Sequence, residues 1–404
     1  MRFFRVVIRD PRTNEILVPN FNGQPGFTHR PFDGTLSTYT SLNAGASVFQ
    51  IGGTNPAAQM VELDLPVTYF GQPDGNAQPF IKIHGVGVKE IAQAANLNGM
   101  LIDIYGGMAK GLPLADPSQA GCIVRGQIWQ SYGTWIGTDQ ALSIYLTLQS
   151  SPTANQTTAN PSTTSTTPLP VTGDTPANIV FQWRAGQPLL SPLVNTLQTA
   201  FPQYTIVGAV HSGLVWAGAT ATGYFRKLTE LAQFINQKSL SMIAGYAPAV
   251  YTSAAPSYGG VIIYINNAGQ ICIADGTTQT TPRQIQFIDL VGQPTWVDRA
   301  TVQCTTVLRG DISCGDFVVL PNAPGTTTPG STSQFFNAQP GNQYSNAKSG
   351  SIFTGTFLVV RVRHVGNSRN ADAAAWTTTL DLILQSKPGQ VTNSLPVLYK
   401  GQQQ

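Results

Sequence analysis

Residue types that could carry out catalysis or bind a metal are few in this chain of 404 residues, and they stand apart from one another. Nothing indicates a metal site, because the four histidines form no HExxH or HxH arrangement: His29, His84, His211 and His364. The sequence has no GxSxG nucleophile elbow and no phosphate-binding loop of the GxxxxGK(S/T) type. We therefore expect no metal, no cofactor and no enzymatic activity.

Carboxylates and aromatic residues leave two further kinds of site open. A pair of carboxylates could hydrolyse a glycosidic bond, since such pairs form in space and not in sequence. The supply is small, because the chain has 19 acidic residues and several of them, such as Asp10, Asp311 and Asp316, are typical of turns. Large aromatic residues would suit either a sugar-binding platform or anchors of a core or interface. They are Trp129, Tyr132, Trp135 and Trp296.

The densest basic group lies in the last fifty residues. It consists of Arg361, Arg363, His364 and Arg369, in a chain whose formal net charge is only +3. The group is either the polar face of a hairpin or a charged surface that lines a channel or meets a partner. The net charge is too small and too dispersed to predict specific binding of nucleic acid.

This basic group belongs to one of two similar hairpins that the sequence predicts. Residues 121–150 and 355–386 each read as an alternating strand, a polar turn region rich in Gly, Asn or Asp, and a second alternating strand. They end almost identically, in LTLQS at 146–150 and LILQS at 382–386. The likeness favours a duplicated β-domain, although alternating leucine is common enough to arise by coincidence.

The composition is typical of a β-rich protein that is packed in an assembly or secreted. Charged residues make up 10% of the chain, against about 25% in an average protein. The cysteines form no CxxC pair, which favours buried free thiols over disulfides and suits a reducing cytosol: Cys122, Cys272, Cys304 and Cys314. The opening run MRFFRVVIRDP is too charged for a signal peptide, and no apolar stretch approaches the roughly 18 residues of a membrane span. We therefore expect no membrane insertion.

The pattern of strands, helices and linkers divides the chain into five segments. The expected segments are a first β-domain at 1–150, a Thr/Pro-rich linker or exposed loop at 151–176, an α/β middle module at 177–284, a second β-domain at 285–390 and a polar tail at 391–404. Together they predict a fold that is mainly β, with an α/β middle module.

The middle module is predicted to contain two helices. Ser191 and Pro192 are typical of a helix start, and Pro202 ends the first helix. Apolar residues at helical spacing predict the second helix from about Gly223 to Gln237.

Several segments resemble the baseplate hub proteins of contractile-tailed bacteriophages and related injection machines. The resemblance extends over roughly 180–386. Its most specific pieces are GQPTW at 292–296, ISCGD at 312–316, and RHVGNSR at 363–369 with Trp376. None of these pieces is a catalytic motif.

The resemblance implies a structural protein of the virion, in the tail baseplate, assembled in the host cytoplasm. It implies two tail-tube-like β-barrel domains per protomer and a homotrimer whose pseudo-sixfold ring joins the sixfold tail tube to the threefold spike. The implied partners are further copies of the chain, the tail spike or puncturing protein, the tail tube or tube-initiator protein, the tape measure protein and the baseplate wedge proteins. DNA would only pass through the channel during ejection, without specific binding.

Six residues are expected at the interface or channel of such a ring: Arg361, Arg363, His364, Arg369, Trp296 and Trp376. Neighbouring protomers would pair through barrel edges and hairpins such as 355–386, extending the sheet by strand addition. The alternative is a receptor- or glycan-binding virion protein that uses exposed aromatic residues and Thr-rich loops. A β-rich hydrolase acting on cell-wall polymer is a third hypothesis, which would require a catalytic carboxylate.

Overall fold

The computed structural model describes most of the chain, and its fold is mainly β, as predicted. The described residues are 2–20, 26–43, 53–71, 78–108, 116–148, 177–202, 204–245, 258–266, 269–277, 281–297, 301–321, 356–386 and 397–399. The expected linker at 151–176 lies outside these residues, as does most of the expected tail at 391–404. Within the described residues, none of the helices is long and apolar enough to cross a bilayer.

In its described residues, the first part of the chain forms nine strands and one short α-helix. They are β1 (Arg2–Arg9), β2 (Ile16–Pro19), β3 (Phe27–Arg30), β4 (Tyr39–Thr40), β5 (Met60–Thr68), β6 (Phe80–His84), α1 (Val88–Ala92), β7 (Leu101–Met108), β8 (Gly121–Ile136) and β9 (Asp139–Leu148). Strict alternation along β5 buries Val61, Leu63 and Leu65, the side chains of one face.

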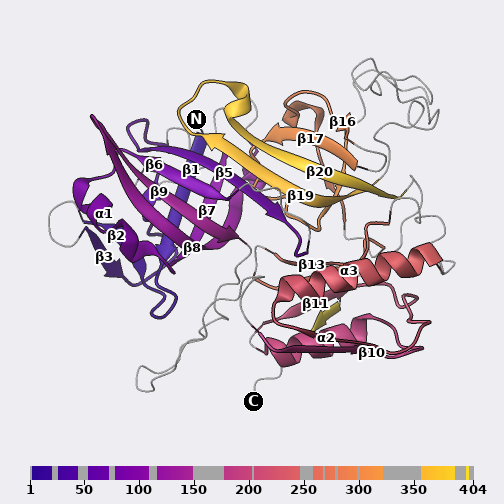
Figure 1. Ribbon diagram of the computed structural model, residues 1–404. Helices are drawn as coiled ribbons and strands as arrows, with labels where there is room; N and C mark the ends of the chain where they lie inside the picture. Colours follow the sequence, from indigo (N-terminus) through magenta and orange to yellow (C-terminus); the bar gives the residue numbers. More distant parts are fainter. Residues whose placement is uncertain are drawn as a thin grey trace, which may run out of the picture.

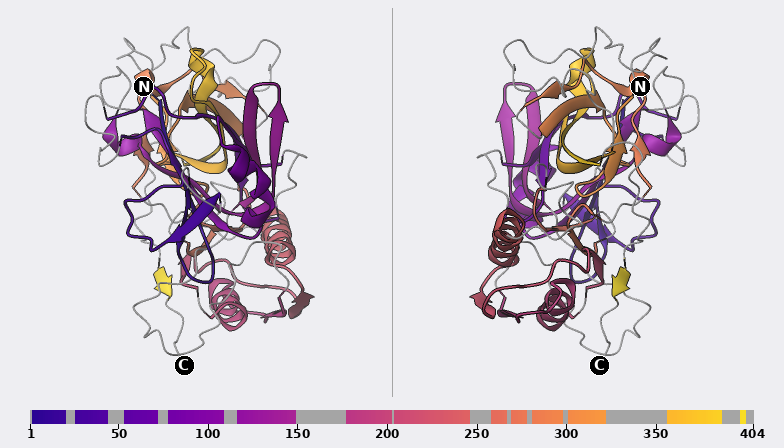
Figure 2. Two further views of the ribbon diagram at one scale, coloured as in Figure 1. Left: turned by 90° about the vertical axis from the view of Figure 1, so that its left-hand side faces the viewer. Right: turned by 90° about the vertical axis from the view of Figure 1, so that its right-hand side faces the viewer.

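The last part forms a second set of strands: β15 (Arg283–Gln284), β16 (Thr295–Trp296), β17 (Thr301–Val307), β18 (Phe317–Val319), β19 (Thr356–Asn367) and β20 (Trp376–Ser386). Both sets belong to one sheet with the path β16-β17-β20-β19-β5-β6-β9-β8-β7-β1-β2-β3. The sheet curves strongly in both halves (Figure 1, Figure 2). We call β1–β9 the first β-half and β15–β20 the second β-half.

The two β-halves repeat one strand order. In the first, the neighbours run β5-β6-β9-β8-β7, and in the second they run β16-β17-β20-β19-β18, with every pair antiparallel. Chain order and spatial order therefore correspond strand for strand. This topology supports the duplication that the two hairpin sequences predicted.

A β-bulge at the same place in both hairpins sets the correspondence residue by residue. The pairs Ile128↔Leu146 and Val359↔Leu382 come directly before the bulge. The pairs Gln130↔Tyr145 and Arg361↔Asp381 come directly after it. Residues 130–136 of β8 therefore occupy the place that residues 361–367 occupy in β19.

The middle module has its own hydrophobic core and two small sheets. Its elements are β10 (Ile179–Trp183), α2 (Leu190–Ala200), β11 (Ile206–Ala209), β12 (Ala221–Phe225), α3 (Leu228–Gly245), β13 (Ile262–Ile265), β14 (Ile271–Ala274) and the C-terminal β21 (Val397–Tyr399). Figure 1 shows the module beneath the sheet, and Ile262 of β13 packs against Phe317 and Leu358 of the second β-half.

Two details of this module differ from the prediction. Residues 221–225 form β12, paired with β10, so the second helix begins at Leu228 and not near Gly223. Val397–Tyr399 of the expected polar tail form a strand that pairs with β11. Both differences arise because a tertiary strand partner outweighs the local pattern of the sequence.

Candidate functional site

The two β-halves meet where β5 pairs with β19, a contact that we call the joint. Seven residue pairs run antiparallel from Arg361↔Thr68 to Asn367↔Glu62. Along one edge β19 pairs with β20. Along the other edge it pairs with β18 at residues 356–358 and with β5 at residues 361–367, so both edges have strand partners from the same chain. This differs from the expectation that the hairpin at 355–386 pairs between neighbouring protomers, since β5 of the same chain already occupies that edge.

Charged and polar side chains cross the joint on one face. Arg363 donates from Nε and Nη2 to the two carboxylate oxygens of Asp64, at 2.8 and 2.6 Å. Asn367 donates to Glu62 at 3.0 Å. The hydrogen bonds with Asp64 raise the pKa of Arg363, so its guanidinium is charged at neutral pH.

The opposite face of the joint is buried. His364 is 1% exposed, and its Nδ1 lies 2.9 Å from the hydroxyl of Thr378. Burial lowers the pKa of His364 to about 4, partly offset by a backbone hydrogen bond with Ile123. At neutral pH the imidazole is therefore uncharged, and it serves as a core residue.

Trp376, the first residue of β20, packs in the hydrophobic core of the first β-half and so holds the two halves together. It is 2% exposed, packs in the cluster of the first half together with Leu308, and donates from Nε1 to the carbonyl of Gly107 at 3.0 Å. This hydrogen bond satisfies the buried indole N–H and fixes the orientation of the ring in the core.

A buried charge network forms a second connection between the β-halves. Arg309 contacts Asp289 at 3.1 Å and both carboxylate oxygens of Asp311 at 2.9 and 2.7 Å. From the first β-half, Gln119 donates to Asp289 at 2.9 Å. Because every charge has a partner, the network ties the two halves together without leaving an unpaired buried ion.

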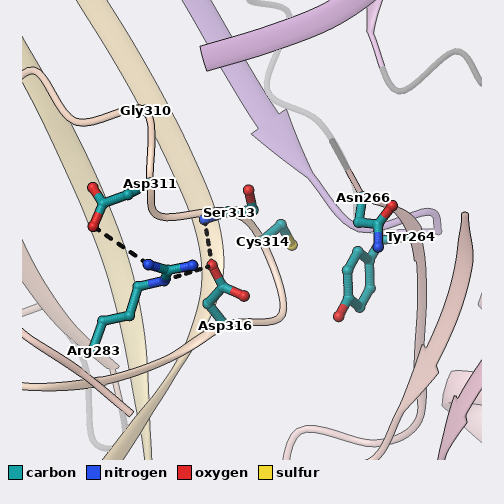
Figure 3. Close-up of a pocket in the computed structure, with 8 residues that line it drawn as sticks. All are labelled: Tyr264, Asn266, Arg283, Gly310, Asp311, Ser313, Cys314 and Asp316. Atoms are coloured by element: carbon teal, nitrogen blue, oxygen red, sulfur yellow. Dashed lines mark hydrogen bonds and ion pairs between the residues drawn. The ribbon is translucent and has the colours of Figure 1, made fainter. Parts of the chain in front are cut away.

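A pocket of about 310 Å³ lies between the second β-half and the middle module (Figure 3). Arg283 stands between Asp311 and Asp316, with nitrogen–oxygen distances of 3.7 Å to each, and the backbone N–H of Ser313 donates to Asp316 at 2.8 Å. The remaining lining residues are Tyr264, Asn266, Gly310 and Cys314.

The ISCGD segment at 312–316 shapes this pocket by packing. Gly315 has φ +87°, and a Cβ atom there would lie 2.1 Å from the ring of Tyr264. Only glycine permits both the backbone conformation and the close approach of Tyr264. The segment therefore serves the contact between the second β-half and the middle module.

The chemistry available in the pocket and elsewhere is limited. Burial raises the pKa of Asp316, but Arg283 lies beside it. Among the described residues, no group of three His, Cys, Asp or Glu side chains could hold a metal ion. The four cysteines are free thiols, and burial raises the pKa to about 11 at Cys122 and about 12 at Cys272 and Cys304, so little reactive thiolate forms at neutral pH.

The structure brings together three of the six residues expected at an interface or channel. All three lie at the joint. Its charged face holds Arg363, its buried face holds His364, and Trp376 is the buried residue that anchors it in the core. Arg361 is half-buried at the start of the same pairing. The exposed Arg369 donates to the carbonyl of Ala58. Trp296 lies apart from them, half-buried on β16 at the end of the sheet.

Four large apolar residues lie exposed on the second half of β8, with Tyr132 and Trp135 on opposite faces of the strand. The exposed fractions are 60% for Trp129, 43% for Tyr132, 62% for Trp135 and 73% for Ile136. Strand β7 pairs with β8 only as far as Gln127. In the described part of the chain, no strand lies along the corresponding edge of residues 132–136. We call these five residues the open edge.

Sequence reasoning missed the polar partners that connect the two β-halves. Asp64 at the joint, and Gln119, Asp289 and Arg309 in the buried network, were not among the expected site residues. Their only signal is that each is a polar residue close to a buried strand, and that signal does not identify which strands meet.

The comparisons with known proteins give distant structural likenesses. No protein-family model and no curated protein matches the sequence. The 43 kDa tail protein of prophage MuSo2 from Shewanella oneidensis is similar with a TM-score of 0.37 and 7% identity, over 81% of this chain and 97% of that chain. A tail protein from Neisseria meningitidis MC58 gives a TM-score of 0.40 and 9% identity, over 94% and 96%. A lidless PdpA-VgrG complex gives a TM-score of 0.35 and 6% identity, over 97% and 66%.

Proposed function

We propose that the chain is a structural hub of a phage-tail baseplate. In this proposal three copies form a closed ring that joins the sixfold tail tube to the threefold central spike and encloses part of the DNA channel. The chain performs no chemistry in this role, and its partners are further copies of itself, the spike and the tube.

One observation carries the proposal: the two β-halves repeat the same strand order and are joined edge to edge. A chain with two equivalent units presents six units when three copies close into a ring. Such a ring meets a sixfold partner with its repeated units and a threefold partner with its whole protomers, which is the geometry that a tube-to-spike adaptor requires.

The contacts within the chain suit this mechanical role. The joint combines seven backbone pairs, a two-pronged ion pair and a buried tryptophan, so the two units are held at a fixed angle. Its buried histidine is neutral and its arginine charged at neutral pH, so neither group changes its charge around pH 7.

The test is the mass of the purified protein in solution, alone and mixed with its candidate spike, followed by negative-stain averaging. The proposal expects a threefold ring with six similar lobes. A protein that stays monomeric with every tail partner, at concentrations well above those used for imaging, would overturn it.

The exposed aromatic residues on β8 favour one second candidate. Each of Trp129, Tyr132 and Trp135 would suit the flat face of a sugar ring in a receptor- or glycan-binding virion protein. Binding to a glycan array that is lost on replacing Trp135 by alanine, in a protein that remains monomeric, would favour this function over the hub.

A further inference from the structure

The open edge of β8 corresponds to β19, and the end strand β16 corresponds to β5. These two strands, β19 and β5, are the ones that pair at the joint. Residues 130–136 of β8 occupy the place of residues 361–367 of β19, which pair with β5. Among the described residues, the first β-half has no strand that pairs with this part of β8, and the second β-half has none that pairs with the outer edge of β16, the last strand of the sheet path.

The position of β16 follows from the same pairings. Asp64 of β5 is opposite Phe80, which is opposite Tyr145. In the second half Thr295 is opposite Gln303, which is opposite Asp381. Because Tyr145 and Asp381 correspond, Thr295 takes the place of Asp64, and β16 takes the place of β5.

We infer that β16 of a second copy of this chain pairs with the open edge of β8, in the register of the joint. In the joint Val365 is opposite Asp64. The corresponding residues are Thr134 on β8 and Thr295 on β16, so these two threonines face each other across the contact between copies. This inference rests on the proposed ring, and it names the strands through which the copies meet.

The side chains on the two strands fit this pairing. In this register Tyr132 is opposite Val297, and these residues are 43% and 61% exposed in the single chain. Trp135 is opposite Pro294. An aromatic residue facing a β-branched one across an antiparallel pair is a favourable contact, worth roughly 0.2–1 kcal/mol. Pairing would thus cover the exposed apolar residues and supply backbone hydrogen bonds to both edges.

The surfaces lie at different ends of the sheet, so one copy offers β8 while it uses β16 on the next. Figure 1 shows β16 on the far side of the second β-half and β8 in the first. A contact between two different surfaces is heterologous, and it produces a ring when the rotation between copies closes.

The experiment is disulfide trapping with Thr134→Cys and Thr295→Cys in one chain. Both threonines are half-buried strand residues, and directly opposite positions lie within the distance that a disulfide spans. The four native thiols give little background, since burial raises the pKa of each. The matched control is Thr134→Cys with Val291→Cys, four positions from Thr295 and outside β16, beyond the left-handed Gly292, where the backbone N–H of Val291 donates to Thr305.

The inference expects mild oxidation to link copies at least about tenfold more efficiently in the first variant than in the control, with release by a reductant. Mixing the two single-cysteine proteins should give only linked pairs. A ring seen by mass but with equal or absent linking would overturn the strand assignment and leave the hub intact. A protein that is monomeric and unlinked with every tail partner would overturn both.

A second variant avoids added cysteines. Val297→Lys places a charge opposite Tyr132 in the contact and leaves the single chain nearly unchanged, because Val297 is exposed. The inference expects the ring to dissociate into folded monomers, with the melting temperature of the monomer preserved. A ring that survives this change with unaltered affinity would overturn the assignment.

Discussion

The joint and the open edge occupy the same place in two copies of one strand order, yet they carry different residues. Where β19 has Arg363 and His364, β8 has Tyr132 and Gly133. The joint links two parts of one chain, so its strands meet at a high effective concentration, and its exposed face carries an ion pair. The open edge has exposed aromatic residues instead, which are the residues that a contact between separate molecules uses for affinity. The comparison teaches that connectivity, more than position in the fold, decides which side chains a strand edge carries.

The largest effect should come from emptying the core of the joint. Trp376→Ala removes a buried indole and its hydrogen bond to Gly107, so we expect the free energy of unfolding to fall by about 3–5 kcal/mol. Trp135→Ala is the matched control on the open edge and should change monomer stability by less than about 0.5 kcal/mol. Urea unfolding of both variants tests this, and equal losses would remove the distinction between the two regions.

Acid should weaken the joint through His364. Its pKa in the folded chain is about 4, below the value of about 6.5 in an unfolded chain. The unfolded chain therefore binds the proton more readily, so stability falls as the pH drops below about 6.5, and roughly 3 kcal/mol is lost by pH 4. In His364→Gln this part of the pH dependence should be absent. Denaturant unfolding between pH 4 and 7 measures the difference, and an unchanged slope would contradict the assignment.

The open edge should affect assembly and spare the fold. Replacing Tyr132 by alanine should weaken the contact between copies by about 2 kcal/mol, roughly thirtyfold in affinity, as expected for an aromatic anchor in an interface. Monomer stability should stay within about 1 kcal/mol of the wild type. Mass measured across a dilution series gives the affinity, and a variant that assembles like the wild type would show that this residue is not an anchor.

The smallest effect should come from the charged face of the joint. Arg363→Ala removes an ion pair whose arginine side chain is 46% exposed, so the expected loss is about 0.2–1 kcal/mol and decreases at high salt. A double-mutant cycle with Asp64→Ala isolates the pair. A coupling energy that is zero at low salt would mean that the backbone pairing alone holds this face.

Much of the secondary structure could be predicted from the sequence, but the joint could not. Alternation in the two hairpins predicted β8, β9, β19 and β20, because side chains on a half-buried strand repeat every second residue. The same reasoning failed at Phe225, whose spacing fits a helix but whose strand pairs with β10. Trp135 and Trp376 are both apolar residues in alternating strands, and only the partner strands decide that one is exposed and the other buried. Such pairings connect residues almost 300 positions apart, and no local pattern encodes them.

That separation has a consequence for how the protein is made. Asp64 and Arg363 are 299 residues apart, so at about 5–20 residues per second β5 leaves the ribosome roughly 15–60 s before its partner strand exists. Until then the edge of β5 is available to any other extended chain, including another nascent copy. The joint therefore forms after synthesis, as a late and slow step of folding that limits the yield of soluble protein. Synthesis at lower temperature, or with chaperones that shield strand edges, should raise the soluble yield by protecting β5 during this interval.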